Sequence, residues 1–291
     1  MMYIIADSGS TKTDWCAVDK NDGLVKVNVQ TSGINPIHQK DEDIRVVLEK
    51  ELLPALGEQD IVFNVDEVFF YGAGCIPETH LRMKSLIGSI FPEDVKVEVA
   101  TDLLGAARAL CGCTEGIACI LGTGANSCLY DGNGIVDNVP PLGYILGDEG
   151  SGAVLGKLFL NALLKRDLPK ELGDLYFKES GLTYSDIIEN VYRKPLANRF
   201  MAGIAKFIAC HKDDFPMLCN LVMDNFHSFF RKNVVKYKTL ESDCPVSAVG
   251  SIAWFFREEL REVATLEGFT LGTVCRAPMD GLIRFHLGEN V

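Results

Sequence analysis

The sequence predicts an α/β protein that consists of two similar domains. The main observation is a pattern that occurs twice, over residues 4–18 and again over residues 117–130: an apolar strand, a turn of small residues and a second apolar strand. A second observation is that helices and strands alternate after each of these strand pairs. Because the two turns are similar, the sequence indicates a duplicated architecture that holds a ligand between its two copies.

In the first half of the chain, short apolar and β-branched runs predict five strands, at residues 3–7, 14–19, 24–30, 68–71 and 95–100. A helix is predicted over residues 41–53, where Ile44, Val47, Leu48 and Leu52 recur at helical spacing. A second helix is predicted over residues 81–90. A third, over residues 102–110, is apolar around most of its circumference, which predicts that it is buried between the domains.

The second half repeats the order, with strands predicted at residues 117–122, 127–131 and 135–138 and a helix over residues 150–164. A helical insertion follows at about residues 170–236, then a strand at 246–249, a helix at 252–266, a strand at 270–277 and a last helix at 279–287. The final helix of the insertion is amphipathic, which favours packing against the sheet. A homodimer contact through this helix is the alternative.

The first turn has the composition of a phosphate-binding turn. Small residues let backbone N–H groups converge on an anion, hydroxyl groups add donors, and Lys12 adds positive charge. Asp7, at the end of the first strand, is placed to hold a magnesium ion through water. The turn returns into a strand, so it is not a Walker loop, which opens a helix. An ordinary hairpin is the alternative, and the similar second turn at residues 122–126 favours the phosphate site.

The composition excludes several classes of protein. The chain has 291 residues, of which 47% are hydrophobic, and its formal net charge is −12. No block of basic residues stands out, so neither nucleic acid nor an anionic membrane is expected as a partner. The N-terminal residues lack the features of a signal peptide, and no apolar run approaches the roughly 20 residues of a membrane span, so a cytoplasmic protein is expected. Ten cysteines lie mostly in apolar runs, which indicates buried thiols.

Five motifs occur in a fixed order: residues 7–13, residues 101–102, residues 122–126, residues 147–151 and residues 249–251. With these motifs the chain resembles the sugar kinase, Hsp70 and actin superfamily, and within it the BadF/BadG/BcrA/BcrD ATPase family and its N-acetylglucosamine kinase branch. The resemblance implies two ribonuclease H-like (actin-like ATPase) domains, over residues 1–103 and 104–278, with a nucleotide cleft between them. It also implies that a C-terminal helix, at about residues 279–291, packs on the first domain.

The resemblance implies ATP and Mg²⁺ as cofactors and assigns residues to ATP and to a sugar. The residues expected to bind the ATP phosphates are Ser8, Gly9, Ser10, Thr11, Lys12, Thr13, Gly122, Thr123 and Gly124. Those expected at adenosine are Gly250 and Ser251, where an ordinary strand-to-helix turn fits the sequence equally well. Those expected at the sugar are Asn35, Asn126, Tyr144, Asp148 and Glu149. An ordinary core tyrosine is the alternative for Tyr144.

Asp102 is the candidate general base for phosphoryl transfer. It stands where a strand meets a buried helix, so its side chain can project into the cleft, and the helix N-terminus favours its carboxylate form. A plain helix N-cap is the alternative on the sequence alone, and the Thr-Asp motif of the family favours catalysis. Asp148 has the same ambiguity, because it also precedes a helix.

The leading hypothesis is an ATP-dependent amino-sugar kinase that phosphorylates the 6-hydroxyl of N-acetylglucosamine or glucosamine, with Asp102 as the base of an in-line transfer. One alternative is a BadF-type ATPase that activates a partner enzyme, as in the other branch of the family. Another is a non-catalytic sensor of a nucleotide or a sugar. The expected partners are small molecules, namely ATP and a sugar.

Overall fold

The computed structural model describes residues 1–9, 11–57, 61–237 and 244–289, which form two compact units. The first unit comprises residues 1–114 and 132–134 together with the segment from Pro278 onward. The second comprises residues 115–131 and 135–277. Each unit has its own five-stranded sheet with helices, which confirms the predicted α/β class and its duplication.

The first unit has a sheet of strand order β3-β2-β1-β4-β5. The strands are β1 (Met2–Ser8), β2 (Lys12–Asp19), β3 (Val25–Ser32), β4 (Val65–Gly72) and β5 (Lys96–Thr101). Antiparallel pairing joins β1 to β2 and β2 to β3, whereas β4 is parallel to β1 and β5 is parallel to β4. Strands β1, β4 and β5 are therefore parallel and end at the same edge of the sheet.

Strand β1 is buried on both faces, as expected for the centre of a sheet that is covered on two sides. Ile4 and Ala6 belong to one core, and Ile5 belongs to another with Tyr71 and Leu282. The first core includes α1 (Asp41–Val46), η1 (Val47–Leu52), α2 (Leu53–Gly57) and α3 (Pro77–Gly88), and the second includes α4 (Asp102–Cys111) and α14 (Met279–Leu287). The helix predicted over residues 41–53 is present but is π-helical in its middle, at η1.

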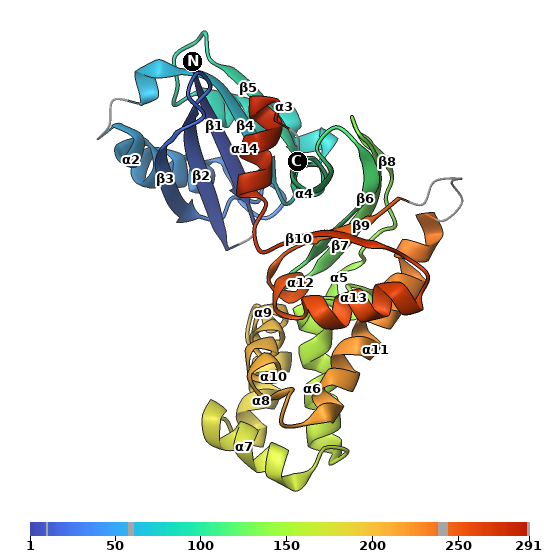
Figure 1. Ribbon diagram of the computed structural model, residues 1–291. Helices are drawn as coiled ribbons and strands as arrows, with labels where there is room; N and C mark the ends of the chain where they lie inside the picture. The colour runs from blue at the N-terminus through green and yellow to red at the C-terminus, as the bar shows by residue number, and fades with distance from the viewer. Residues whose placement is uncertain (10, 58–60, 238–243, 290–291) are drawn as a thin grey trace. The chain divides into compact units, whose positions relative to one another are not determined.

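Helix α4 packs on β4 and β5, so the first unit extends to Thr114, past the expected boundary at residue 103. Helix α14 belongs to the same unit and packs on α4, β1 and β2. Figure 1 shows this C-terminal helix, in red, beside the strands that begin the chain. The two ends of the sequence thus contribute to one fold, and residues 115–277, apart from 132–134, form the other.

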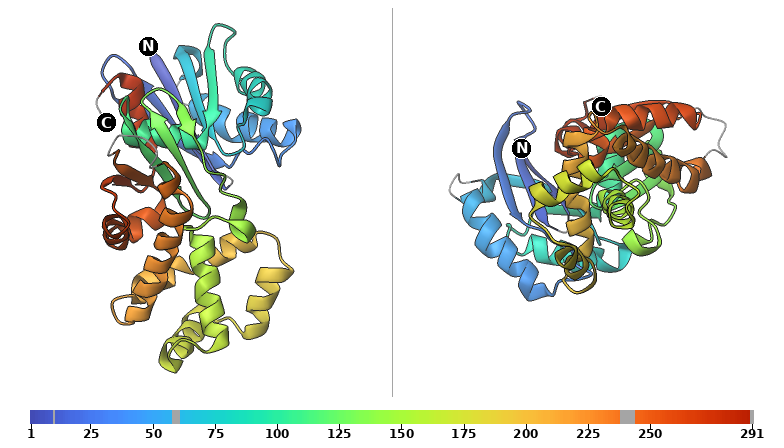
Figure 2. Two further views of the ribbon diagram at one scale, coloured as in Figure 1. Left: turned by 90° about the vertical axis from the view of Figure 1, so that its right-hand side faces the viewer. Right: turned by 90° about the horizontal axis from the view of Figure 1, so that it is seen from below.

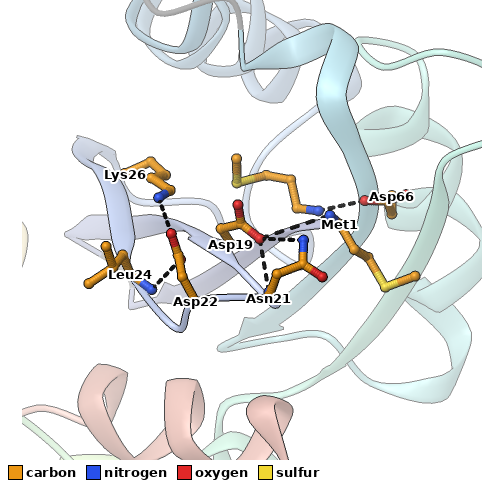
Figure 3. Close-up of polar contacts among 8 residues, drawn as sticks. Met1, Asp19, Asn21, Asp22, Leu24, Lys26 and Asp66 are labelled. Carbon is orange, nitrogen blue, oxygen red and sulfur yellow. Dashed lines mark hydrogen bonds and ion pairs between the residues drawn. The ribbon is translucent and has the colours of Figure 1, made fainter.

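Short side-chain contacts close the turn between β2 and β3 (Figure 3). The Asp19 carboxylate accepts hydrogen bonds from the backbone and the side chain of Asn21, at 2.9 and 3.0 Å. Asp22 accepts one from the Leu24 N–H at 2.8 Å and pairs with Lys26 at 2.7 Å. Asp and Asn stabilise such turns because their side chains bond to the backbone two residues later.

The second unit repeats the topology, with the sheet order β10-β9-β6-β7-β8. The strands are β6 (Glu115–Leu121), β7 (Ala125–Asp131), β8 (Ile135–Asp137), β9 (Val246–Val249) and β10 (Leu271–Cys275). Antiparallel pairing joins β6, β7 and β8, and β9 and β10 add in parallel on the other side of β6. The turn from β6 to β7 therefore has the same place in its sheet as the turn from β1 to β2.

A bundle of helices covers one face of the second sheet. Their bounds are α5 (Gly143–Leu146), α6 (Gly152–Lys165), α7 (Lys170–Ser180), α8 (Tyr184–Tyr192), α9 (Ala197–Gly203), α10 (Ala205–His211), α11 (Pro216–Lys232), η3 (Val234–Tyr237), α12 (Ser251–Phe255) and α13 (Arg257–Leu266). Helix α6 packs on α9, α10 and α11, and α11 also packs on α13. Figure 2 shows α7 to α10 extending beyond the sheet of this unit. The apolar stripe predicted for α11 lies in the core of this unit, where Leu218, Val222 and Phe226 are buried.

The helix predicted over residues 252–266 is divided into α12 and α13 at Phe256. Among the described residues, no helix has both the length and the apolar composition that crossing a membrane requires.

The contact between α14 and α4 leaves no room for a side chain at Gly281, where an added Cβ would lie 2.2 Å from the backbone oxygen of Ala109. We predict that Gly281→Ala lowers the free energy of unfolding by about 1–3 kcal/mol, measured by urea denaturation, because the two helices must move apart. The matched control is Gly57→Ala in α2, since a Cβ there meets no atom of the described residues within 4 Å. Equal stabilities of the two variants would contradict the prediction.

Candidate active site

Two acidic side chains lie where parallel strands of the first sheet end. In the strand register Asp7 is opposite Tyr71, and Tyr71 is opposite Ala100. Asp102 comes two residues after Ala100, at the start of α4. The carboxyl ends of β1, β4 and β5 thus bring Asp7 and Asp102 to the same edge, and the charge of Asp102 is close enough to act on the pKa of Asp7.

Asp102 is the first residue of α4, and Thr101 is the N-cap. The Thr101 hydroxyl accepts a hydrogen bond from the Leu104 N–H at 3.1 Å, so the N-cap alternative for Asp102 is wrong. Asp102 Oδ1 accepts the Leu103 N–H at 2.9 Å, which limits rotation of the carboxyl group. Burial raises the pKa of Asp102, and hydrogen bonds from the Leu103 and Asp102 backbone oppose that rise. A raised pKa suits a carboxyl group that accepts a proton near neutral pH.

The pKa of Asp7 is raised to about 7. Burial is the main cause, the charges of Asp102 and Asp14 add to it, and Lys12 opposes it. Lys12 Nζ lies 2.6 Å from a carboxylate oxygen of Asp14, so its charge is largely shared with that neighbour. The carboxyl group of Asp7 therefore lies in surroundings that disfavour its ionisation and would favour an added cation.

These surroundings fit a magnesium ion held mainly by ligands other than protein. Among the described residues, no group of three or more His, Cys, Asp or Glu side chains could hold a metal ion. Mg²⁺ usually keeps several waters and binds one or two carboxylates together with the phosphates of a substrate. Asp7 supplies such a carboxylate, next to a turn of phosphate-binding composition.

The hydroxyl groups of Ser8 and Thr13, at the two ends of the first turn, point into the unit, whereas Thr11 is exposed. Ser8 and Thr13 are fully buried, and their hydroxyl oxygens lie 2.7 Å apart. Ser8 Oγ also donates to the Ile34 oxygen and accepts the Ile34 N–H. The turn is closed by the Gly9 N–H, which donates to the Lys12 oxygen at 3.0 Å. These two hydroxyls hold the turn in shape, and Ser10, another predicted phosphate ligand, lies outside the described residues.

The Thr11 oxygen accepts the N–H of Gly33, which joins the turn to the segment that carries Asn35. Asn35 Oδ1 accepts the Ile37 N–H at 3.0 Å and lies 2.3 Å from where a Cβ would be at Gly74. Asn35 is thus fixed by its own loop and by the loop that follows β4.

In the second unit, the turn at Gly122, Thr123 and Gly124 is attached to the start of α6. The Gly152 N–H donates to the Gly122 oxygen at 2.8 Å, and the Ala153 N–H donates to the Thr123 oxygen at 3.1 Å. Gly250 packs against the same turn, since a Cβ there would lie 2.3 Å from the Leu121 oxygen, and its φ of 125° suits only glycine. Ser251 then begins α12. Predicted phosphate and adenosine residues are therefore neighbours in this unit.

Residues 147–151, the sugar motif, form a loop with unusual backbone geometry. Asp148 has a φ of 55°, in the left-handed region, and Gly150 has a φ of 84°. The Asp148 N–H donates to the Pro141 oxygen at 2.8 Å, and the Ser151 N–H donates to the Asp148 oxygen at 3.0 Å. Burial raises the pKa of the Asp148 carboxyl group, and a hydrogen bond from the Ala125 N–H partly offsets this rise. The carboxyl group of Asp148 thus lies beside the turn from β6 to β7.

Glu149 is engaged with α11, because its carboxylate lies 2.8 Å from Lys232 Nζ. Burial by itself would raise the pKa of Glu149, but the hydrogen bonds from Lys232 and Asn233 lower it overall. Asn126 Oδ1 accepts hydrogen bonds from the Ser127 N–H and from Asn138. These contacts fix both side chains, and the predicted sugar roles of Glu149 and Asn126 stay predictions.

Tyr144 is partly buried against the core of the second unit, which is the alternative that the sequence left open. Its backbone oxygen accepts a hydrogen bond from Lys157 of α6 at 3.1 Å. Its role at a sugar also stays a prediction.

The sequence reasoning missed Asn225, which is 1% exposed in the middle of α11. Asn225 Oδ1 accepts the Gly150 N–H at 2.9 Å, and its Nδ2 donates to the Ser151 oxygen at 3.1 Å. A signal exists in the sequence, because residue 225 falls on the apolar stripe of the helix, three residues after Val222 and next to Phe226. A polar residue on such a stripe has to find a hydrogen-bonding partner.

No model of a protein family matches the chain, and no curated protein matches it. Solved structures do match. The chain is 50% identical to a proposed N-acetylglucosamine kinase from Porphyromonas gingivalis, over 99% of both chains, with a TM-score of 0.93. It is 17% identical to a proposed N-acetylglucosamine kinase from Chromobacterium violaceum, over 98% of both chains, with a TM-score of 0.74.

A ROK family glucokinase from Streptomyces griseus, in complex with glucose and AMPPNP, is 14% identical over 98% of both chains, with a TM-score of 0.61. At this identity, and at that of the Chromobacterium violaceum protein, the likeness shows the fold alone. Both fit the predicted actin-like ATPase fold.

The raised pKa of Asp7 predicts how stability depends on pH. The folded protein binds the proton more tightly than the unfolded chain, so ionising Asp7 destabilises the fold as pH rises from about 4 to about 7. We predict that Asp7→Asn is more stable than wild type at pH 8 without Mg²⁺ and nucleotide, and that the difference shrinks as pH falls through this range. Urea denaturation at several pH values measures it, with Asp174→Asn, on the exposed side of α7, as the control. Parallel stability curves for wild type and Asp7→Asn would contradict the assignment.

Proposed function

Since the chain belongs to the family of the Porphyromonas gingivalis protein, sugar kinases with the actin-like ATPase fold, we propose that it transfers the γ-phosphoryl group of ATP to the 6-hydroxyl of N-acetylglucosamine or glucosamine. The observation that carries the proposal is 50% identity over 99% of both chains to a proposed N-acetylglucosamine kinase. That this family is a branch of the BadF/BadG/BcrA/BcrD ATPases is part of the same proposal.

Asp102 acts as the general base in this proposal. Phosphoryl transfer needs a group that accepts the proton of the attacking hydroxyl, and a carboxyl group does so best when its pKa is close to the working pH. Burial of Asp102 shifts its pKa in that direction. The hydrogen bond from the Leu103 N–H holds one carboxyl oxygen, so the group has a defined orientation toward an acceptor.

Asp7 would hold the magnesium ion of the MgATP complex in this proposal, through water. When bound, the ion neutralises phosphate charge during the transfer. Its charge would also reverse the effect of Asp102 and Asp14 on Asp7 and favour the carboxylate form.

The contacts in each unit support the other sites of this proposal. In the first unit the turn between β1 and β2 offers backbone N–H groups other than that of Gly9 to phosphate, since the hydroxyls of Ser8 and Thr13 are engaged inside the unit. In the second unit the turn between β6 and β7 binds phosphate, and the backbone at Gly250 and Ser251 approaches adenosine. Asp148 is the main acceptor for the sugar hydroxyl groups and Asn35 adds an amide oxygen, whereas Asn126 offers its amide nitrogen as a donor, because its oxygen already accepts two hydrogen bonds.

A coupled assay that detects ADP, run across hexoses and amino sugars, tests the proposal. We predict turnover with N-acetylglucosamine or glucosamine above that with other hexoses and a low rate without a sugar. We also predict that Asp102→Asn lowers kcat by about 10²–10⁴-fold, the usual range for a general base.

Sugar binding to Asp102→Asn, measured by calorimetry, is the control, because the amide keeps the size of the side chain. Fast ATP hydrolysis that no sugar alters would refute the kinase. Turnover of Asp102→Asn within a few-fold of wild type would leave the kinase standing but reject Asp102 as its base.

For the metal, we predict that Asp7→Asn raises the Mg²⁺ concentration needed for half-maximal turnover by about 10–100-fold, as expected for a ligand that acts through water. Calorimetric titration of Mg²⁺ into the ADP complex gives a second readout that does not depend on turnover. Asp174→Asn again serves as the control. An unchanged Mg²⁺ dependence in both measurements rejects the metal role of Asp7.

A further inference from the structure

Asn225 joins α11 to the backbone of the sugar motif at two successive residues. Its side-chain oxygen accepts the Gly150 N–H, and its side-chain nitrogen donates to the Ser151 oxygen. Both polar ends of this buried amide are therefore satisfied, and both partners are backbone groups. A side chain that fills this volume without polar atoms would leave the Gly150 N–H and the Ser151 oxygen without these bonds.

The segment that Asn225 holds has little freedom to relax. A Cβ at Gly150 would lie 2.9 Å from the ring of Phe229, and one at Gly147 would lie 2.0 Å from the Pro141 oxygen. Asp148 lies between them in the left-handed region, which is unfavourable for residues other than glycine, although Asp and Asn adopt it more readily than most. Such a conformation persists only where surrounding contacts impose it.

The position of this segment decides where the Asp148 carboxyl group lies. That carboxyl group accepts a hydrogen bond from Ala125, beside the predicted phosphate turn. The N–H groups of Gly152 and Ala153, directly after the motif, donate to the Gly122 and Thr123 oxygens. A shift at residues 150–151 would therefore move the Asp148 carboxyl group relative to the turn.

We propose that Asn225 is a positioning residue for the acceptor sugar: its two hydrogen bonds to Gly150 and Ser151 keep Asp148 in the left-handed conformation that directs its carboxyl group to the sugar. The proposal rests on the proposed sugar kinase function. Asn225 itself contacts neither substrate, so its loss acts through Asp148.

The variant Asn225→Asp makes the test specific, because it keeps the shape of the side chain and changes one group. When ionised, its carboxylate still accepts the Gly150 N–H but has no proton for Ser151 and faces that oxygen with negative charge. When protonated, it is a close mimic of the amide and can donate to Ser151. Burial raises the pKa of a carboxyl group, so the protonated form returns under mildly acidic conditions.

We expect Asn225→Asp at pH 8 to raise KM for the sugar by about tenfold or more, the effect of leaving a buried group without its bond. KM for ATP should change much less, and the sugar KM should return toward that of wild type as pH is lowered to about 5.5. Wild type measured at each pH corrects for its own titration. Asn225→Leu, which lacks both polar groups, should show the raised sugar KM at every pH.

The matched control is Leu218→Ala, a fully buried position two turns earlier on α11, which destabilises the same helix without touching the loop. It should lower the melting temperature and leave the sugar KM unchanged. A raised sugar KM in Leu218→Ala equal to that of Asn225→Asp would overturn the proposal, because general destabilisation would then explain both.

Amide hydrogen exchange in peptides covering residues 145–153 separates this proposal from the proposed function. Faster exchange in Asn225→Asp at pH 8 than in Leu218→Ala supports a loop held by Asn225, whether or not wild type phosphorylates a sugar. Equal exchange in all proteins, or faster exchange with an unchanged sugar KM, overturns it. Absence of sugar phosphorylation by wild type counts against the proposed function alone.

Discussion

The carboxyl group of Asp7 loses hydration where β1 ends, and the charges of Asp102 and Asp14 make its ionisation still less favourable. The sheet imposes this arrangement, because β1, β4 and β5 are parallel and end at one edge. Two acidic groups at such an edge lower the stability of the empty protein and raise its affinity for a cation. Phosphate binding at the turn between β1 and β2 and the base role proposed for Asp102 both depend on how this negative charge is balanced.

Much of the fold follows from local patterns. Short apolar and β-branched runs with turns of small residues are sufficient to predict the strands, and the repeated strand–turn–strand pattern predicts that each sheet has the same topology. The π-helical turn at Val47–Leu52 has no such signal, because its residues also suit an ordinary α-helix. The division at Phe256 was missed for the same reason.

The candidate site could be predicted as a set of residues but not as a set of contacts. Sequence motifs correctly place Asp7 near the end of β1, Asp102 at the start of α4 and Asp148 in the loop before α6. The motifs do not predict that the hydroxyl groups of Ser8 and Thr13 point into the unit or that Glu149 pairs with Lys232. These contacts involve residues that are distant in sequence. Asn225 illustrates the same limit, since its partners lie about 75 positions earlier in the chain.

The place of α14 has a consequence for how the protein is made. Its residues are translated after the whole second unit, yet they cover the second core of the first unit through Leu282. A chain that leaves the ribosome N-terminus first therefore exposes that face of the first sheet until α14 has been translated. The second unit, whose sequence is nearly continuous, has all of its residues translated before α14 is made. During translation the unit encoded later is the first that can reach its finished fold.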